Sequence, residues 1–327
     1  MSAHPPEISI LLVTFNHELY VDQALASIAS QGYGGAIEVV VADDASTDST
    51  HERIRAWAAA HEDRLAVRFL EVTENLGITR NYQRGFAACA GRYVAVLEGD
   101  DYWTSPNKLA RQIDFLNEHL ECNLCSTNYF VYDEDCARFT PRTDIAEGHI
   151  LLSARQLIAD NVVGNFSACV YRNDALANLP PRLFEIKSYD WIVNICIARN
   201  SLIGYLNAPM SVYRIHSGGA WSSSTTKAKI MAQRDAIDGY NALTNGIFSK
   251  EFTDLRRRLE LIVGKRPLQG EHALRVESVQ TGEDRRSQNW RQRLVDVTPP
   301  FLIWAVKWAV PPMVLRAARR LVRGPEA

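Results

Sequence analysis

The N-terminal third of the chain alternates between short apolar runs and stretches with a helical period. Unbroken apolar runs occupy Ile8–Val13, Ile37–Ala42 and Tyr93–Leu97, and polar residues follow each of them. Such runs are typical of parallel strands that are buried on both faces. The intervening stretches, such as 18–31 and 80–88, carry apolar residues at helical spacing. This alternation predicts an α/β fold with a mixed, mostly parallel sheet flanked by helices.

Acidic pairs lie where two of these strands end. Asp43-Asp44 follows one strand, and Asp100-Asp101 follows another. Sheets of this kind bind ligands beyond the carboxyl ends of their strands, and adjacent like charges repel unless a cation or polar ligand neutralises them. Both pairs therefore predict a ligand site. Two structural alternatives stay open: Asp43 and Asp44 could cap the following helix, and Asp100-Asp101 could form a turn.

The chain lacks the glycine-rich loops that cradle phosphates. It contains no GxxxxGK[ST] sequence, and no GxGxxG follows the first strand. Walker-type ATPases and dinucleotide dehydrogenases are therefore disfavoured. A nucleotide diphosphate held through a divalent cation would fit instead, because hard cations such as Mg²⁺ take one or two protein carboxylates together with substrate phosphates.

Composition narrows the class of partner. The 327 residues include 36 Lys and Arg against 38 Asp and Glu, and the net charge is -2 at pH 7. Such a chain lacks the positive field that drives binding to phosphate backbones, so no nucleic-acid partner is expected. The six cysteines are too few for a disulfide framework, and the first residues lack the basic and apolar regions of a signal peptide, which predicts a cytoplasmic protein.

Several short motifs, in a fixed order, resemble those of the family 2 glycosyltransferases. These enzymes have the GT-A fold and move a sugar with inversion from a nucleotide-diphosphate donor to an acceptor. The likeness covers approximately Ile8 to Ser222 and rests on the order of the motifs rather than on any one of them. The motifs are Val13-Thr14-Phe15-Asn16, Asp43-Asp44-Ala45-Ser46-Thr47-Asp48, Asn75-Leu76-Gly77 with Arg80-Asn81, Gly91-Arg92-Tyr93 leading into Glu98-Gly99-Asp100-Asp101, and Tyr213-Arg214-Ile215-His216.

The resemblance implies a role for each donor-site residue. Phe15 would pack on the nucleobase, Asp44 would bind its edge, and Asp43 would lie beside it. Asp100 would contact the ribose or the donor sugar, and Arg80 would lie near the nucleotide. The full set of implied nucleotide- and donor-binding residues is Thr14, Phe15, Asn16, Asp43, Asp44, Asn75, Arg80 and Asp100.

The same resemblance implies a divalent metal, Mn²⁺ or Mg²⁺. Asp101 would ligate the metal that bridges the diphosphate, and His216 could be a further ligand or a diphosphate contact. The chain departs from many relatives at Gly99, since it carries Gly-Asp-Asp where they carry a three-residue DxD. A lone histidine is more often structural, so that alternative for His216 stays open.

The resemblance places the catalytic base in the stretch 185–191, and Asp190 is the predicted residue. A carboxylate at the start of a helix lies beside the positive end of the helix dipole, which favours the ionised form that a base needs. Glu185 is the reserve candidate. The alternative is that Asp190 is only the N-cap of the helix that follows it.

The expected organisation has three parts. A GT-A catalytic domain spans residues 1–222, with a nucleotide-binding half of about 1–103 and an acceptor half of about 104–222. A helical extension and polar connector spans 223–298, and an amphipathic basic segment spans 299–327. The glycines and serine at 217–219 could form a lid over the nucleotide.

The C-terminal segment suggests a peripheral contact with a membrane. Residues 301–315 are strongly apolar but too short to span a bilayer, and they contain Trp304 and Trp308, followed by four arginines. Tryptophan with neighbouring basic residues is typical of a helix in the interface of an anionic bilayer. The alternative is a helix docked on the catalytic domain or on a second copy in a homodimer.

The resulting hypothesis is a metal-dependent inverting glycosyltransferase. It would transfer a sugar from a UDP-sugar to a lipid-linked saccharide acceptor in surface polysaccharide biosynthesis, at the cytoplasmic face of the inner membrane. Two alternatives remain: a non-catalytic nucleotide- or saccharide-binding module of the same fold, and a sugar nucleotidyltransferase. The latter is disfavoured because no glycine- and arginine-rich loop follows the first strand.

Overall fold

The computed structural model describes residues 6–71, 73–186, 189–219 and 225–264. These residues belong to one compact unit, Met1–Lys265. The polar connector after residue 264 and the predicted membrane-binding segment 299–327 lie outside the described residues. Of the helices that the structure describes, none has the length and apolar character needed to cross a bilayer.

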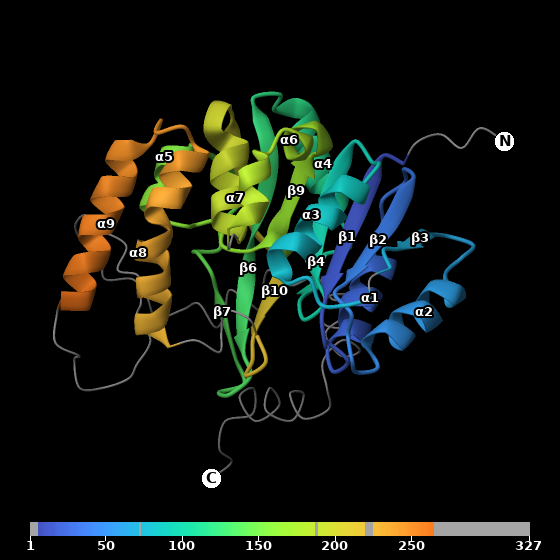
Figure 1. The fold of residues 1–327 in the computed structure, drawn as a ribbon. Coiled ribbons are helices and arrows are strands. Elements are labelled where there is room, and N and C mark those ends of the chain that lie inside the picture. The colour runs from blue at the N-terminus through green and yellow to red at the C-terminus, as the bar shows by residue number, and fades with distance from the viewer. Residues whose placement is uncertain (1–5, 72, 187–188, 220–224, 265–327) are drawn as a thin grey trace, which may run out of the picture. The chain divides into compact units, whose positions relative to one another are not determined.

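The strands of the described part form one ten-stranded sheet (Figure 1). Along its main path the order is β3-β2-β1-β4-β9-β6-β10-β5, with β7 paired to β6 and β8 paired to β10. The strands are β1 Ile8–Thr14, β2 Ile37–Asp43, β3 Ala66–Phe69, β4 Tyr93–Glu98, β5 Tyr102–Trp103, β6 Cys122–Asp133, β7 Arg138–Pro141, β8 His149–Leu152, β9 Cys169–Arg172 and β10 Leu202–Ile215.

The predicted mixed, mostly parallel arrangement is confirmed. β3, β2, β1 and β4 run parallel to one another, whereas β9 runs antiparallel between β4 and β6. β6 and β10 are again parallel to each other. The antiparallel pairs involve β9 and the short strands β5, β7 and β8, all of which follow β4 along the chain.

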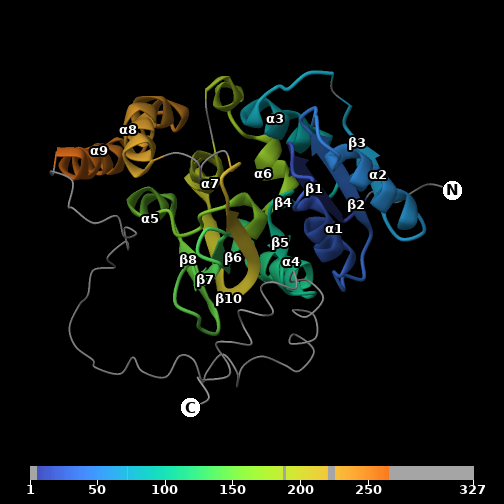
Figure 2. The ribbon, with the colours of Figure 1, turned by 90° about the horizontal axis from the view of Figure 1, so that it is seen from below.

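Helices cover both faces of the sheet (Figure 2). Side chains of α1, α2 and α4 join one hydrophobic cluster, and side chains of α3, α5, α6, α7, α8 and α9 join the other. The helices are α1 Val21–Ala29, α2 Thr50–Ala60, α3 Ile78–Ala88, α4 Lys108–Glu118, α5 Ala154–Ala159, α6 Asn173–Ala177, α7 Asp190–Ile197, α8 Thr226–Leu243 and α9 Ser249–Gly264, with 3-10 turns η1 Phe166–Ala168, η2 Pro181–Glu185 and η3 Ala198–Asn200.

The alternation along β4 shows why its sequence is apolar throughout. Val94 and Val96 belong to the cluster under α3 and α7, and Ala95 and Leu97 belong to the cluster under α1 and α4. Successive side chains of a strand point to opposite faces, so burial of both faces requires an unbroken apolar run. Glu98 continues the series on the α3 side, where it meets a tyrosine hydroxyl of that helix.

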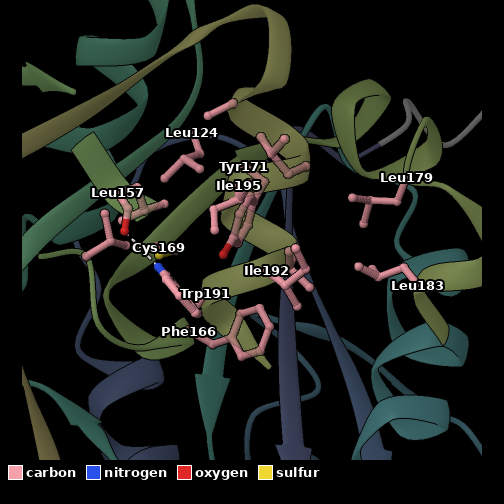
Figure 3. Close-up of a cluster of buried hydrophobic side chains, with 14 of the residues drawn as sticks. Leu124, Leu157, Phe166, Cys169, Tyr171, Leu179, Leu183, Trp191, Ile192 and Ile195 are labelled. Atoms are coloured by element: carbon pink, nitrogen blue, oxygen red, sulfur yellow. Dashed lines mark hydrogen bonds between the residues drawn. The ribbon is translucent and has the colours of Figure 1, made fainter. Parts of the chain in front are cut away.

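The cluster on the α3 and α7 side surrounds the start of α7 (Figure 3). The indole Nε1 of Trp191 donates to the carbonyl oxygen of Leu157 at 2.8 Å, which links α7 to α5. The rings of Trp191 and Tyr240 lie 6.0 Å apart, so α8 packs on the same helix. In the described part of the chain, the helical extension predicted from residue 223 corresponds to two helices, α8 and α9, that add apolar side chains to this cluster.

Candidate active site

The parallel strands bring the predicted donor residues to one edge. The registers pair Thr14 with Asp43, and Val13 with Glu98, so the ends of β1, β2 and β4 are level. The carboxyl-edge location expected for this kind of sheet is therefore present in the structure.

Asp44 holds the loop that precedes α3. Its two carboxylate oxygens accept hydrogen bonds from the backbone N–H groups of Leu76 and Gly77, each at 2.9 Å. The Asn75 side-chain amide donates to the carbonyl oxygen of Asp44 at 3.1 Å. Gly77 has φ +81°, a conformation that glycine adopts without strain. Asp44 and Asn75 are thus brought together, but the Asp44 carboxylate is already bound within the protein.

The turn after β1 crosses the turn after β2. The Asn16 side-chain oxygen accepts from the backbone N–H of Thr47 at 2.8 Å, and the Asn16 backbone N–H donates to the Ser46 hydroxyl at 2.9 Å. The Asp43 carboxylate accepts from the Ser46 hydroxyl at 2.5 Å and lies 3.2 Å from His51 Nδ1. The Phe15 side chain remains 41% exposed, which leaves a free aromatic surface beside these turns.

Asp100 faces two imidazole rings. His216 Nε2 lies 3.1 Å from Asp100 Oδ2, and His17 Nε2 lies 3.7 Å from the same oxygen. Burial alone would raise the pKa of Asp100, but the charge of His17 and the hydrogen bond and charge of His216 outweigh it and lower that pKa. The ionised Asp100 carboxylate therefore lies beside an imidazole nitrogen of His216 at the edge of the sheet.

Asp101 differs from Asp100 in its burial, its hydrogen bonds and the direction of its pKa shift. Its side chain is 0% exposed. One carboxylate oxygen accepts from the Ser167 hydroxyl at 2.6 Å, and the other accepts from the backbone N–H of Arg214 at 2.9 Å. Burial, with the charges of Asp100 and Glu98 nearby, raises the pKa of Asp101 well above its usual value. This geometry favours Asp100 over Asp101 as the carboxylate that is available to a metal.

Because Gly99 has no side chain, it leaves room for His17, which lies in the turn after β1. A Cβ on Gly99 would lie 2.7 Å from Thr14 Oγ1 and 2.8 Å from His17 Nδ1. Those two atoms are themselves 3.2 Å apart, so Thr14 fixes the His17 ring. The departure from a three-residue DxD at Gly99 thus has a packing reason.

The arginine predicted near the nucleotide is exposed. Arg80 Nη1 donates to the Gln83 side chain at 2.9 Å, within α3. One turn later, Arg84 donates to the carbonyl oxygen of Leu70 at 2.7 Å and to that of Asp43. Arg84 therefore braces the end of β2, whereas Arg80 keeps an exposed guanidinium.

Asp190 is the first residue of α7, and Tyr189 is the N-cap. The N-cap alternative for Asp190 is therefore wrong. Asp190 Oδ2 is buried without a hydrogen-bond partner. Burial raises the pKa of Asp190 to about 7, although the backbone of Trp191 and the charge of Arg142 act to lower it. Desolvation therefore outweighs the preference for the ionised form that a helix N-terminus provides.

A second carboxyl group lies close to Asp190. Glu98 accepts a hydrogen bond from the Tyr82 hydroxyl at 2.9 Å. Burial, followed by the charge of Asp100 and then by that of Asp190, raises the pKa of Glu98 to about 8. Glu185, the reserve candidate for the base, is exposed at the end of η2.

Some residues that touch these groups were not predicted from the sequence. His17 could have been found, because it directly follows the motif at the end of β1. Ser167 could not, since it lies in a stretch without a recognisable motif and far along the chain from Asp101. In the described ranges, no group of three or more His, Cys, Asp or Glu side chains is arranged to hold a metal.

Comparison with known sequences identifies the family. The model for glycosyl transferase family 2 matches residues 9–178, a span that ends before Asp190 and His216. An uncharacterised protein of Mycobacterium tuberculosis is 34% identical over 222 residues, which cover 67% of this chain and 62% of the relative. The putative teichuronic acid biosynthesis glycosyltransferase TuaG of Bacillus subtilis is 29% identical over 135 residues, which cover 41% of this chain and 51% of TuaG. The chain therefore spans less than two thirds of the mycobacterial relative.

Solved structures share the fold. Residues 1–349 of Staphylococcus aureus TarS, in complex with UDP-GlcNAc, align with a TM-score of 0.57 and 19% identity over 79% of this chain and 76% of that chain. The mannosyltransferase PcManGT of Pyrobaculum calidifontis, in complex with GDP-Man and Mn²⁺, aligns with a TM-score of 0.55 and 19% identity over 79% of this chain and 71% of that chain. The predicted GT-A fold is confirmed by these similarities. Because the family model matches more than half of its length, this chain belongs to glycosyl transferase family 2.

Proposed function

We propose that the protein transfers a sugar, with inversion, from a nucleotide-diphosphate sugar to a saccharide acceptor, and that Asp190 is the general base. The observation that carries this proposal is the buried, unpartnered Oδ2 of Asp190. Burial that raises the pKa to about 7 suits a group that must accept a proton near neutral pH. The oxygen is buried yet has no hydrogen-bond partner among the residues that the structure describes, as expected for an atom that binds an acceptor hydroxyl.

The donor site is proposed at the ends of β1, β2 and β4. Phe15 would pack on the base, and Asn16, Thr14, Asp43, Asp44 and Asn75 would shape the pocket around the nucleoside. Arg80 has an exposed guanidinium that could pair with a diphosphate oxygen. Support for a UDP donor comes from TarS, whose structure contains UDP-GlcNAc, although PcManGT contains GDP-Man.

Asp100 and His216 would hold a divalent cation, Mn²⁺ or Mg²⁺, together with the diphosphate. A carboxylate oxygen and an imidazole nitrogen 3.1 Å apart fit the donor set of such a cation, and the diphosphate would supply further oxygens. The bound cation would neutralise charge on the departing diphosphate. This proposal replaces Asp101 with Asp100 as the ligand, because the Asp101 oxygens are already bound within the protein.

The protein's own side chains take part in the proposed reaction through one proton transfer. Asp190 would accept the proton of the acceptor hydroxyl while that oxygen attacks the anomeric carbon on the face opposite the diphosphate. Attack from the opposite face inverts the configuration. A lipid-linked saccharide in surface polysaccharide biosynthesis is the acceptor that we propose, at the cytoplasmic face of the inner membrane, and TuaG is a relative whose name places it in teichuronic acid biosynthesis.

A donor screen tests the proposal. Purified protein would be incubated with Mn²⁺ or Mg²⁺ and a panel of UDP, GDP and dTDP sugars, and release of nucleoside diphosphate would be measured. We expect release from one donor, its loss with a chelator, and its loss in Asp100→Asn and Asp190→Asn. Asp174→Asn, at an exposed position on α6, is the matched control and should retain activity. Tight nucleotide binding without release from any donor would instead indicate a binding module.

A further inference from the structure

Arg214 is a buried arginine near the end of β10, two residues before His216. The residue is 8% exposed, and each nitrogen of its guanidinium group has an acceptor within the protein. Nε donates to the backbone carbonyl oxygen of Asp100 at 2.8 Å, and Nη2 donates to the Gln23 side chain at 2.7 Å. Nη1 pairs with a carboxylate oxygen of Glu134 at 3.4 Å. A buried charge whose nitrogens all bind within the protein suits a fixed structural role rather than direct contact with a ligand.

We propose that Arg214 is a positioning residue, which fixes the two side chains of the proposed metal site, Asp100 and His216, relative to each other. This inference rests on the proposed metal-binding role of that pair. Arg214 acts on Asp100 through the backbone of the acidic turn, residues 100–101. It acts on His216 through the ring of Tyr20, which lies in the turn between β1 and α1.

The acidic turn is bound to Arg214 at two points. The backbone N–H of Arg214 donates to a carboxylate oxygen of Asp101 at 2.9 Å, and Nε donates to the carbonyl oxygen of Asp100. Two bonds from one residue restrict both the position and the rotation of the peptide that carries the Asp100 side chain. Alternate residues of an extended segment face the same side, so Arg214 and His216 both face Asp100.

Tyr20 connects Arg214 to the ring of His216. The centroids of the Tyr20 and His216 rings lie 4.6 Å apart, and the guanidinium carbon of Arg214 lies 4.8 Å from the centroid of Tyr20. The Tyr20 hydroxyl donates at 3.1 Å to Glu134, which is also the carboxylate that pairs with Arg214. The backbone N–H of Glu134 donates to the carbonyl oxygen of Ile215 at 3.1 Å. Tyr20 is therefore fixed by both charged groups, and its ring limits the rotation of the His216 imidazole.

Two further rings hold the guanidinium group itself. The centroids of Tyr102 and Tyr132 lie 5.5 Å and 5.7 Å from its central carbon. Tyr132 pairs with Arg214 in the register of β6 and β10, and Tyr102 pairs with Val212 across β5 and β10. A planar guanidinium stacks on aromatic rings and donates in fixed directions, whereas an ammonium is a point charge on a flexible stem. Substitution by lysine would therefore keep the charge but lose the fixed set of three bonds.

The first variant is Arg214→Lys, measured by calorimetric binding of UDP, GDP and dTDP with and without Mn²⁺. We expect wild-type protein to bind one of these nucleotides more tightly with Mn²⁺. Arg214→Lys should weaken that binding by about tenfold and leave binding without Mn²⁺ unchanged, the pattern expected when a group behind a metal ligand is lost. A merely structural defect would weaken both. Thermal unfolding would establish that the variant is folded.

Arg172→Lys is the matched control for this variant. Arg172 also donates to backbone carbonyl oxygens, those of Cys122 and Leu116, and its guanidinium lies 5.9 Å from the centroid of the Tyr93 ring. It pairs with Tyr93 at the start of β4, at the opposite edge from the acidic turn. Binding should therefore be unchanged in Arg172→Lys, both with and without Mn²⁺.

The second variant, Tyr20→Phe, tests the path to His216 with a smaller change. It removes the hydroxyl that binds Glu134 and retains the ring, so the proposal remains testable if Arg214→Lys does not fold. We expect Mn²⁺-dependent binding to weaken by about threefold, with metal-free binding unchanged. Tyr132→Phe is the matched control, because its ring also faces Arg214 while no hydrogen bond to its hydroxyl is found in the described part of the chain.

The outcomes separate this inference from the proposed function. Wild-type Mn²⁺-dependent affinity in both Arg214→Lys and Tyr20→Phe would overturn the role of Arg214 alone. An equal loss with and without Mn²⁺ in a folded Arg214→Lys would show that Arg214 contacts the nucleotide directly, which also overturns the positioning role. Wild-type protein whose nucleotide binding does not respond to Mn²⁺ would instead overturn the proposed metal site itself.

Discussion

Two groups of carboxylates lie at the carboxyl edge of the sheet, and they differ in what already binds their oxygens. Both oxygens of Asp44 and both oxygens of Asp101 accept hydrogen bonds from protein donors. Asp100 faces two imidazoles across the edge, and Asp190 keeps one buried oxygen without a partner. A carboxylate bound on all sides sets the shape of the site, whereas a carboxylate with a free oxygen can act on a ligand. Substitution should therefore cost stability in the first group and activity in the second.

The largest effect is expected for Asp190→Asn. Loss of a general base should lower kcat by about 10²- to 10⁴-fold and leave donor binding intact. Initial rates at saturating donor, with nucleotide affinity measured by calorimetry, would establish the split. A parallel loss of donor affinity would place Asp190 among the structural carboxylates and contradict the comparison.

The same variant should also be more stable than the wild-type protein, with a defined pH dependence. The pKa of Asp190 in the fold is about 7, above the value of 3.8 in an unfolded chain, so ionisation at high pH destabilises the fold. The destabilisation is absent below about pH 4, grows between the two pKa values and is complete above about pH 7. Asp190→Asn should thus raise the thermal unfolding midpoint at high pH, and the gain should vanish on acidification. Equal midpoints at every pH would show that the Asp190 carboxylate is solvated.

The next largest effects should separate Asp100→Ala from Asp101→Ala. Asp101→Ala leaves the Ser167 hydroxyl and the Arg214 N–H without an acceptor, at a cost of about 1–3 kcal/mol in the free energy of unfolding. Asp100→Ala should retain most of the stability but weaken metal-dependent nucleotide binding by at least about tenfold. Thermal unfolding and calorimetry on both variants would check this. Retained metal-dependent binding in Asp100→Ala, with its loss in a stably folded Asp101→Ala, would restore Asp101 as the metal ligand.

The fold was predictable because both faces of the first strands are buried. Ile8–Val13 and Ile37–Ala42 each contribute side chains to both hydrophobic clusters, so their apolar runs report directly on strand position. The short strands of the acceptor half carry less information. The four residues of β7, for example, are all exposed and are held only by pairing with β6. A strand defined by its partner, rather than by its own burial, leaves little trace in the sequence.

The sequence position of a residue relative to the end of a strand was enough to predict which residues meet at the candidate site. Asp43 ends β2, and Asp44 and Asp100 come just after strand ends, so the structure brings all three to one edge. The orientation of each side chain was not predictable, because the partners come from distant segments. Ser167, for example, binds Asp101 from 66 residues away, so the difference between Asp100 and Asp101 appears only after folding.

A smaller effect is expected for two arginines one turn apart on α3. Arg84→Ala removes donors to the carbonyl oxygens of Leu70 and Asp43 and should lower the thermal unfolding midpoint by a few degrees. Arg80→Ala removes an exposed side chain, so stability should be unchanged while donor KM rises by a few fold. Unfolding curves and donor titrations would distinguish the two. A donor KM unaffected in Arg80→Ala would remove Arg80 from the proposed donor site.

The smallest effect on activity is expected for Lys108→Met, which tests whether an unpartnered polar atom always marks a substrate site. The Lys108 ammonium is buried without a hydrogen-bond partner and lies 4.6 Å from the centroid of the Trp103 ring. Burial lowers the pKa of Lys108 to about 7, so the unpaired charge destabilises the fold most strongly below that pH. The destabilisation fades as pH rises toward 10.5, the pKa of the side chain in an unfolded chain. Unlike Asp190, which begins α7, Lys108 is the first residue of α4 and points its ammonium at the Trp103 ring. Lys108→Met should therefore raise the unfolding midpoint at about pH 6, raise it less above about pH 9, and change kcat and donor KM by less than about twofold. A large loss of kcat with a stable fold would show that this amine, like the Asp190 carboxylate, belongs to the chemistry.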